Sequence, residues 1–508
     1  NNHRVNYELV PDPKFNKKSE EKIQDKVLNN SKNLSDKDKE IIIKLSEDLQ
    51  QRQEHVDDPE ILPKVTIKDI PGLRDYPKAK SKNYKNTNNL YYETGTNGIT
   101  YHSMIFPCKN LSKEEFKLTS LFTNTLTDIG IGDKSYEEVQ KIQSSITGGI
   151  SANFMLLPSV NAGQHELALK ITSKSLEKNE QKMQDLILQT CKNPDFNNKE
   201  RILDILNFTV SANDRSLIQN GHVLAMSSAA SQINNIAATN DIASGLSFIS
   251  NTKKILSSID QKGNLEKYIK ALKSIKDKIS SDPIHSFTAS SKELDSSDLI
   301  FDFKNNNLLN QVQDYFSPQN LSIGWITGAQ VCYCAEAFPT VDVFHEDAAA
   351  LTVLGAVLRN GYLHSAIRER GGAYGAGAMQ DSSNKVFKFF SYRDPRCTDT
   401  FTDFYNSREW SLKNITQAQL EEGILGVVSS IDKPLSPFGE AMSDFGCNIE
   451  NRTQESRLKF RSNVKECTLN QLVDVSRKYL FNDSKKSLIA GESFENEIKD
   501  LGLKVKTI

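Results

Sequence analysis

The sequence predicts an α+β fold, in which a helical hairpin linker precedes two homologous α/β sandwich domains, each an antiparallel sheet covered by helices. Three observations predict this fold. The 508 residues are too many for one hydrophobic core. Strand-like segments followed by longer helical segments occur in each half of the chain, an order typical of an antiparallel sheet with helices on one face. A charged tract of helix-favouring residues precedes both halves.

The first residues alternate between polar and apolar side chains from Arg4 to Leu9, which is the period of a half-buried strand. A single strand cannot bury its apolar face alone. We therefore expect residues 1–13 to be the terminal strand of a preceding domain, so that the chain begins inside a larger polypeptide.

Residues 14–78 are expected to form the helical hairpin and a proline-marked tether. Ser35 and Asp38 have the spacing of a capping box at the start of the second helix, and an apolar stripe runs from Ile42 to Leu49. The alternative is a disordered charged linker, because the stripe is short and the tract is very polar.

Residues 79–290 are expected to form the first sandwich, and a polar stretch at 280–297 is interpreted as the separation from the next body. Apolar residues recur at helical spacing between Leu118 and Ile129. Strands are expected at 100–106, 149–157 and 164–173, with helices at 112–129, 135–145, 176–192 and 198–234.

Residues 291–508 are expected to form the second sandwich. Strands are expected at 329–338, 386–393 and 488–490, with helices at 346–359, 416–431 and 469–480. The repeated order of elements implies an internal duplication, although the two bodies share little residue identity.

Charge and composition exclude several classes of function. Sixty-three basic and sixty-five acidic residues leave a net charge of -2, which indicates neither nucleic-acid binding nor strong attraction to membranes. The longest apolar run, Ala348 to Leu358, is far shorter than the roughly 20 residues that span a bilayer. The seven scattered cysteines favour a reducing compartment, and Cys332 and Cys334 are interpreted as a buried pair on one face of a strand.

None of the common hydrolytic motifs is present. The eight histidines include no H-x-x-E-H or H-E-x-x-H pattern, and His345-Glu346-Asp347 lacks the second histidine that would complete a zinc site. The sequence also lacks a G-x-S-x-G nucleophile turn and a G-x-x-x-x-G-K-[ST] phosphate loop. No metal ligand is therefore assigned to this chain.

The segment from Ile367 to Gly375 places a guanidinium, Arg368, and a phenol, Tyr374, six residues apart across Gly371 and Gly372. Such a turn can direct two hydrogen-bond donors at one carbonyl oxygen, as a peptide-cleaving site requires. The alternatives are a surface pairing of Arg368 with an acid, a phenol satisfied within a core, and glycines that serve packing only.

Five strings resemble, in order over essentially the whole chain, the C-terminal half of presequence protease and falcilysin, in the insulinase/pitrilysin class of zinc metallopeptidases. They are HRVNYELVPDP (3–13), TGGISANF (147–154), HSAIRERGGAYGAGA (364–378), FKFFSYRDP (387–395) and SSIDKPLSPFGEA (429–441).

The resemblance implies half of a clamshell that closes around a peptide chamber. It implies that the chain holds the tail of the family's second domain, the hairpin, the third domain at 79–290 and the fourth at 291–508. The zinc motif belongs to the missing first domain, and the helix at 112–129 takes the place of a zinc-binding helix without a histidine. Zinc and the N-terminal half are therefore the implied cofactor and partner.

The resemblance also implies the roles of the site residues. Arg368 and Tyr374 hydrogen-bond carbonyl oxygens near the scissile bond, and Arg393, Gly371 and Gly372 contact the substrate. The implied function is degradation of short unstructured peptides, such as targeting presequences, by the complete enzyme, whereas this chain alone is expected to be inactive. The expected location is a soluble, reducing one, either an organelle interior such as the mitochondrion or a bacterial cytoplasm. The alternatives are a non-catalytic pseudo-peptidase subunit and a two-domain interaction protein.

Overall fold

The computed structural model describes residues 3–10, 12, 14–55, 58, 61, 64–72, 74–84, 87–158, 165–292 and 316–508. The chain divides into two compact units, Asn1–Val65 and Thr66–Ile508. The end of the linker thus differs from the predicted residue 78. The tether belongs to the larger unit, because Ile70 is buried there and Arg461 donates a 2.9 Å hydrogen bond to the carbonyl of Pro71.

The smaller unit contains two helices, α1 (Phe15–Lys32) and α2 (Asp36–Glu54). Ser35 caps α2 through the predicted box, because its hydroxyl accepts from the backbone of Asp38 and the Asp38 carboxylate accepts from the backbone of Ser35. Residues 3–10 are exposed and form no strand within this chain, and their assignment to the end of a preceding domain stays a prediction. Alternation alone does not make a strand, since the backbone groups need a neighbouring strand to bond.

The first sheet of the larger unit has six strands in the order β1-β2-β8-β3-β6-β5. One face carries Met104, Phe106 and Ile171, which pack on helices α4, α6 and α11. The strands are β1 (Lys80–Tyr84), β2 (Thr87–Glu93), β3 (Ile99–Pro107), β5 (Thr147–Pro158), β6 (His165–Leu176) and β8 (His285–Ser290), and the helices are α4 (Thr119–Leu126), α6 (Glu180–Lys192) and α11 (Asn264–Asp277).

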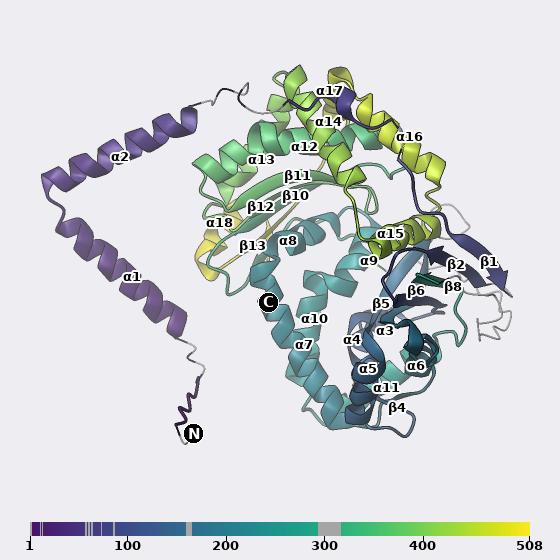
Figure 1. Ribbon diagram of the computed structural model, residues 1–508. Helices are drawn as coiled ribbons and strands as arrows, with labels where there is room; N and C mark the ends of the chain where they lie inside the picture. Colours follow the sequence, from purple (N-terminus) through teal and green to yellow (C-terminus); the bar gives the residue numbers. More distant parts are fainter. Residues whose placement is uncertain are drawn as a thin grey trace. The chain divides into compact units, whose positions relative to one another are not determined.

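The second sheet also has six strands, in the order β11-β12-β10-β13-β9-β14. Its helix-covered face carries Phe338, Phe387 and Phe389, packed on α12, α13, α14 and α17 (Figure 1). The strands are β9 (Ile323–Ile326), β10 (Tyr333–Pro339), β11 (Gly375–Asp381), β12 (Val386–Tyr392), β13 (Lys485–Ala490) and β14 (Lys504–Thr507), and the helices are α12 (Ala348–Leu358), α13 (Thr398–Ser411), α14 (Gln417–Asp432) and α17 (Leu469–Tyr479).

The two sheets share one topology, which is the duplication that the element order implies. In the first sheet β2 runs parallel to β8, and β3 lies antiparallel between β8 and β6. In the second, β9 runs parallel to β13, and β10 lies antiparallel between β13 and β12. Each sheet ends in a matching hairpin, β5-β6 or β11-β12. Only the added outer strands, β1 and β14, differ in direction.

Each repeat contributes one helix to the other repeat's sheet. Helix α8 (Gly221–Ala230) of the first repeat covers the second sheet, where Trp325 donates a 2.9 Å hydrogen bond to Ser228. Helix α15 (Pro437–Ile449) of the second repeat covers the first sheet, where Phe445 lies 5.1 Å from Phe287, centroid to centroid (Figure 1). Both sheets are therefore enclosed on two faces by helices.

Several predicted elements differ from the structure. The helix expected at 112–129 is interrupted between α3 (Lys113–Phe116) and α4, where the Thr119 hydroxyl donates a 2.8 Å hydrogen bond to the carbonyl of Phe116. The polar stretch at 280–297 is not a separator throughout, since it contains β8, an internal strand with Phe287 fully buried. The helix expected at 198–234 is broken between α7 (Lys199–Gln219) and α8. The remaining helices are α5 (Tyr136–Ile146), α9 (Asn235–Ser244), α10 (Leu246–Ser258), α16 (Gln454–Lys465) and α18 (Glu495–Asp500).

The cysteine pair lies as predicted on one face of its strand. Cys332 and Cys334 are fully buried in the second sheet's helix-covered core, which Cys397 also joins. All seven cysteines are free thiols. Among the described residues, no helix combines the length and the apolar composition that crossing a membrane requires.

Candidate substrate-binding site

The site begins where helix α12 changes form. The chain continues from Leu358 directly into a π-helix, η4 (Arg359–Arg370), whose wider turns are uncommon and frequently occur at functional sites. Gly371 ends this helix and is buried, with Arg396 packed where a side chain would lie. Gly372 follows with φ +79°, a left-handed conformation that glycine adopts without steric cost. The glycine pair thus turns the chain from the helix into β11.

The structure gives the two predicted substrate-binding glycines different surroundings. Gly371 is a packing position, because a Cβ atom there would approach the carbonyl oxygen of Ile367 to 2.5 Å. Gly372 is exposed, and Pro395 is the neighbour that a Cβ atom would meet, at 3.6 Å. Only Gly372 leaves its backbone accessible to another molecule.

Arg368 lies on the last turn of η4 with an exposed side chain. Its Nη1 atom donates to Nε2 of His364 at 3.4 Å, and Nδ1 of His364 lies 3.4 Å from Oε1 of Glu369. Arg368 is therefore not paired directly with the neighbouring acid, and most of its donor groups face solvent. The guanidinium is available to accept a partner from outside the chain.

Tyr374 lies just before β11 and 66% of its surface is exposed. Its backbone N–H donates to the carbonyls of Tyr392 at 3.0 Å and Arg393 at 3.3 Å, and its ring stands edge-on to the Tyr392 ring at a centroid distance of 5.4 Å. Within the described part of the chain, the Tyr374 hydroxyl has no hydrogen-bond partner. The ring is held in place, while the phenol remains free to donate.

Arg393 follows β12 in a left-handed backbone conformation, φ +50°, which costs free energy in a residue other than glycine and is often found at functional sites. Its guanidinium lies 5.3 Å from the centroid of Tyr392. Burial raises the pKa of Tyr333, whereas the charge of Arg393 and its hydrogen bond to Tyr333 lower it. Arg393 and Tyr374 thus share one support, the ring of Tyr392.

A histidine from the other repeat lies under this support. His222, at the start of α8, lies 4.6 Å from the Tyr392 ring and 5.6 Å from the Phe390 ring, centroid to centroid, and burial lowers its pKa. The neighbouring Gly221 leaves room for the ring of Tyr333, whose hydroxyl donates to the carbonyl of Ile218 at 2.6 Å. Sequence reasoning missed His222 and Tyr392, because nothing local to either residue indicates a contact between the repeats.

The arrangement offers donors beside an open strand. The Tyr374 ring and the Arg393 guanidinium both contact the ring of Tyr392. No hydrogen bond joins Arg368 to Tyr374 in the described structure. Strand β11 is the outer strand of its sheet as far as the described residues extend, so its free edge could bond an extended peptide. The chemistry available here is hydrogen bonding to peptide carbonyl oxygens.

The residues of this chain do not fit a zinc ion. Among the described residues, no three side chains of histidine, cysteine, aspartate or glutamate converge as metal ligands. At the nearest sequence match, Asp347 is already bonded to Lys478 at 2.6 Å and Tyr479 at 2.7 Å.

Comparison with known proteins shows which family shares this architecture. The family model for the region associated with M16 peptidases of subfamily C matches residues 9–255, and that for the PreP C-terminal domain matches residues 326–489. The chain is 28% identical to the mitochondrial presequence protease of Yarrowia lipolytica, over 97% of this chain and 50% of that protein. It is 27% identical to the Drosophila melanogaster protein of the same name, over 95% of this chain and 47% of the relative. The chain thus spans about half the length of these relatives.

Two solved structures share the fold. A protease from Helicobacter pylori aligns with a TM-score of 0.57 at 15% identity, over 82% of this chain and 100% of that one. A peptidase M16 inactive domain from Pseudomonas fluorescens aligns with a TM-score of 0.55 at 14% identity, over 82% of this chain and 98% of that one. These two structures show the fold, and the two family models together with the presequence-protease relatives show that the chain belongs to the M16 peptidases and matches the C-terminal half of a presequence protease.

Proposed function

We propose that this chain is the substrate-binding half of a zinc metalloendopeptidase that degrades short, unstructured peptides such as targeting presequences. The observation that carries the proposal is the Tyr374 phenol, which is exposed and without a hydrogen-bond partner in the described residues, beside the open edge of β11. The names of the relatives, presequence proteases, support this function and disfavour a purely non-catalytic subunit.

In this proposal Tyr374 and Arg368 donate hydrogen bonds to carbonyl oxygens at or next to the bond that is cleaved. Donors fixed in position before the reaction stabilise the negative charge that develops on such an oxygen. Arg393 and the exposed backbone of Gly372 hold the peptide on either side. An enclosed chamber would admit only flexible peptides, because a folded protein cannot enter it.

The partner in this proposal is the N-terminal half of the same enzyme, which would carry the zinc. None of the residues described in this chain is proposed as a zinc ligand, and the chain alone is expected to cleave nothing. The names of the relatives place them in mitochondria, and we propose an organelle interior for this protein as well.

The test replaces Tyr374 by phenylalanine in the complete enzyme and follows cleavage of a fluorogenic unstructured peptide. Loss of one donor to the developing oxyanion is expected to lower kcat by about 10²- to 10³-fold. Tyr405→Phe is the matched control, because Tyr405 is also an exposed tyrosine, 48% accessible, but lies on α13 and bonds Glu409. Equal kcat values for Tyr374→Phe and the unsubstituted enzyme would refute the assigned role.

A further inference from the structure

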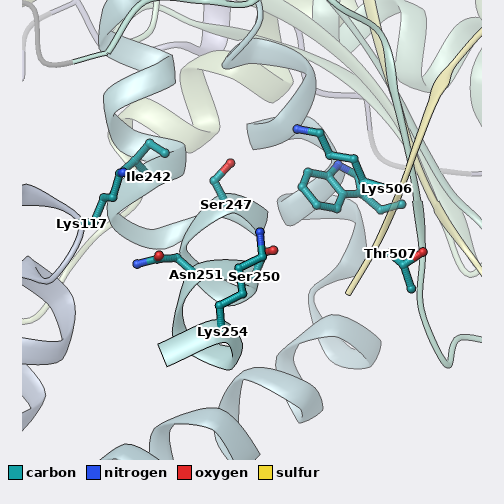
Figure 2. Close-up of a pocket in the computed structure, with 9 residues that line it drawn as sticks. Lys117, Ile242, Ser247, Ser250, Asn251, Lys254, Lys506 and Thr507 are labelled. Carbon is teal, nitrogen blue, oxygen red and sulfur yellow. The ribbon is translucent and has the colours of Figure 1, made fainter. Parts of the chain in front are cut away.

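A cavity lined by lysines lies at the edge of the second sheet that is opposite to Tyr374. Its volume is about 450 Å³, and its walls come from both repeats: helices α9 and α10 and the residue Lys117 of the first, and strands β9 and β14 of the second (Figure 2). Paired residues on adjacent strands lead across the sheet from this cavity. Lys506 of β14 pairs with Trp325 of β9, Trp325 pairs with Ile489 of β13, and Ile489 pairs with Tyr333 of β10. At about 4.8 Å per strand, the cavity is roughly 20 Å from Tyr392, which separates it from the candidate peptide site.

The cavity is positively charged. Lys117, Lys254 and Lys506 line it, and no acidic side chain is among the lining residues. Lys117 bonds Glu114 at 2.7 Å, but Lys254 and Lys506 form no ion pair or hydrogen bond through their ammonium groups with any described residue. Burial lowers the pKa of Lys506, as do the charges of Lys504 and Lys254, whereas the charge of Asp241 raises it. Neither ammonium group therefore has a hydrogen-bonded counter-ion among the described residues.

One buried acid, Asp241, interacts electrostatically with Lys506 of the cavity. Asp241 is 3% exposed and accepts the backbone N–H of Leu246 at 3.1 Å, so that its oxygens serve the first turn of α10. Burial raises the pKa of Asp241, although its hydrogen bonds and Lys506 lower it. The carboxyl group is thus held by hydrogen bonds at the start of α10, and its charge also acts on Lys506.

Neutral donors join the lysines on the cavity wall. The Ser250 hydroxyl and the Asn251 amide have no hydrogen-bond partner among the residues the structure describes. The Trp325 indole N–H donates a 2.9 Å hydrogen bond to the Ser228 hydroxyl, and the Lys506 ammonium lies 5.0 Å from the centroid of the Trp325 ring. Trp325 therefore shapes the wall and positions Lys506, while Ser250, Asn251 and the two lysines are left for a ligand.

We propose that this cavity binds a small anion that carries more than one phosphate group. Lysine binds phosphate as a point charge, and lysines are the charged side chains among the described residues that line the cavity. The volume lies within the range of about 300–1,000 Å³ that small-ligand sites occupy. Two ammonium groups without a hydrogen-bonded counter-ion and two neutral donors match the oxygens of a condensed phosphate.

The test is isothermal titration calorimetry of the 508-residue chain with inorganic tripolyphosphate at low ionic strength. We expect a Kd of about 1 mM or tighter, and citrate, an anion with three carboxylates, should bind at least about tenfold more weakly because it carries fewer negative charges than tripolyphosphate at neutral pH. A Kd above about 10 mM for tripolyphosphate, or equal binding of citrate, would overturn the proposal.

The variants Lys254→Gln and Lys506→Gln locate the site. Each should weaken tripolyphosphate binding by about tenfold or more, since each removes one of the two ammonium groups without a hydrogen-bonded counter-ion. Lys253→Gln is the matched control, because Lys253 is the adjacent residue on α10 but pairs with Asp214 at 2.7 Å outside the cavity. Equal weakening by Lys253→Gln would show a general surface charge effect and would exclude the cavity as the site. Circular dichroism of each variant verifies that the fold is retained.

Discussion

The ring of Tyr374 stands edge-on to the ring of Tyr392, with the centroids 5.4 Å apart and the ring planes at 88°. Tyr392 in turn rests on His222, 4.6 Å away on helix α8 of the other repeat. The orientation of the exposed phenol is therefore set by a column of rings that begins in the first repeat. Substitutions in this column should change catalysis without touching the substrate.

Replacing Tyr392 by leucine in the complete enzyme tests this support. An edge-to-face pair contributes about 0.5–1.5 kcal/mol, so we expect kcat/KM for an unstructured peptide to fall by up to about tenfold through looser placement of Tyr374. Tyr405→Leu, which removes an exposed ring away from the column, should leave cleavage unchanged. Equal kinetics for Tyr392→Leu and the parent enzyme would show that the column does not position the phenol.

Alanine substitutions in the glycine turn should lower the free energy of unfolding by different amounts. Gly371→Ala would place a methyl group 2.5 Å from the carbonyl oxygen of Ile367, and should lower the free energy of unfolding by about 1–3 kcal/mol. Gly372→Ala would hold a left-handed backbone, φ +79°, at a cost of about 1–2 kcal/mol. Gly375→Ala is the control, because a Cβ atom there meets nothing within 4 Å. Urea denaturation of the chain measures all three, and a Gly371→Ala variant as stable as Gly375→Ala would contradict the packing role.

The helix that each repeat contributes to the other should be essential for stability. Phe445 of α15 is fully buried against Phe287 of the first sheet. We expect Phe445→Ala to lower the free energy of unfolding by about 3–5 kcal/mol through the cavity it leaves. Phe344→Ala, at a residue 59% exposed, should change it by no more than about 0.5 kcal/mol. Similar chemical denaturation midpoints for the two variants would rule out this contribution.

The first sheet should become unstable in mild acid because it buries His102. Burial lowers the pKa of this imidazole from 6.5 to about 4, and Nδ1 lies 2.8 Å from the hydroxyl of Thr288. The unfolded chain therefore takes up the proton first. The stability from the neutral ring is complete above about pH 6.5 and is lost as the pH falls towards 4, with an upper limit of roughly 3 kcal/mol at about 1.4 kcal/mol per pKa unit.

Thermal melting between pH 4 and pH 7 measures this loss. His102→Gln should reduce the slope of Tm with pH, whereas His55→Gln, at an exposed residue of the hairpin unit, should leave the slope unchanged. An identical slope in His102→Gln and the parent chain would show that His102 does not contribute to the pH dependence. His285, whose pKa burial also lowers to about 4, accounts for part of the slope that remains.

The sequence predicted those elements whose pattern is local. The capping box of Ser35 and Asp38 and the apolar helix before Arg359 formed close to the expected bounds. The central strand β8 was missed because polar residues such as Thr288 and Ser290 alternate with its apolar ones, and its burial depends on helix α15 far along the chain. The π-helix was missed as well, since its wider hydrogen bonding leaves no distinct spacing of apolar residues.

The candidate site was predictable only in its exposed parts. Arg368 and Tyr374 were proposed from the glycine pair between them and from the family resemblance; both side chains are exposed, and their role stays a prediction. Their supports, Tyr392 and His222, come together through packing between the two repeats. The lysines of the basic cavity likewise come from three separate segments, so no spacing along the chain predicts that they lie together.

The exchange of α8 and α15 also bears on how such a chain arose. A polypeptide made of one repeat would leave an apolar sheet face bare in water, and it would regain cover by associating with an identical polypeptide that offers its own helix. The exchange of helices between the two repeats is thus the arrangement expected of two copies of one polypeptide that cover each other's sheets, held here within a single chain.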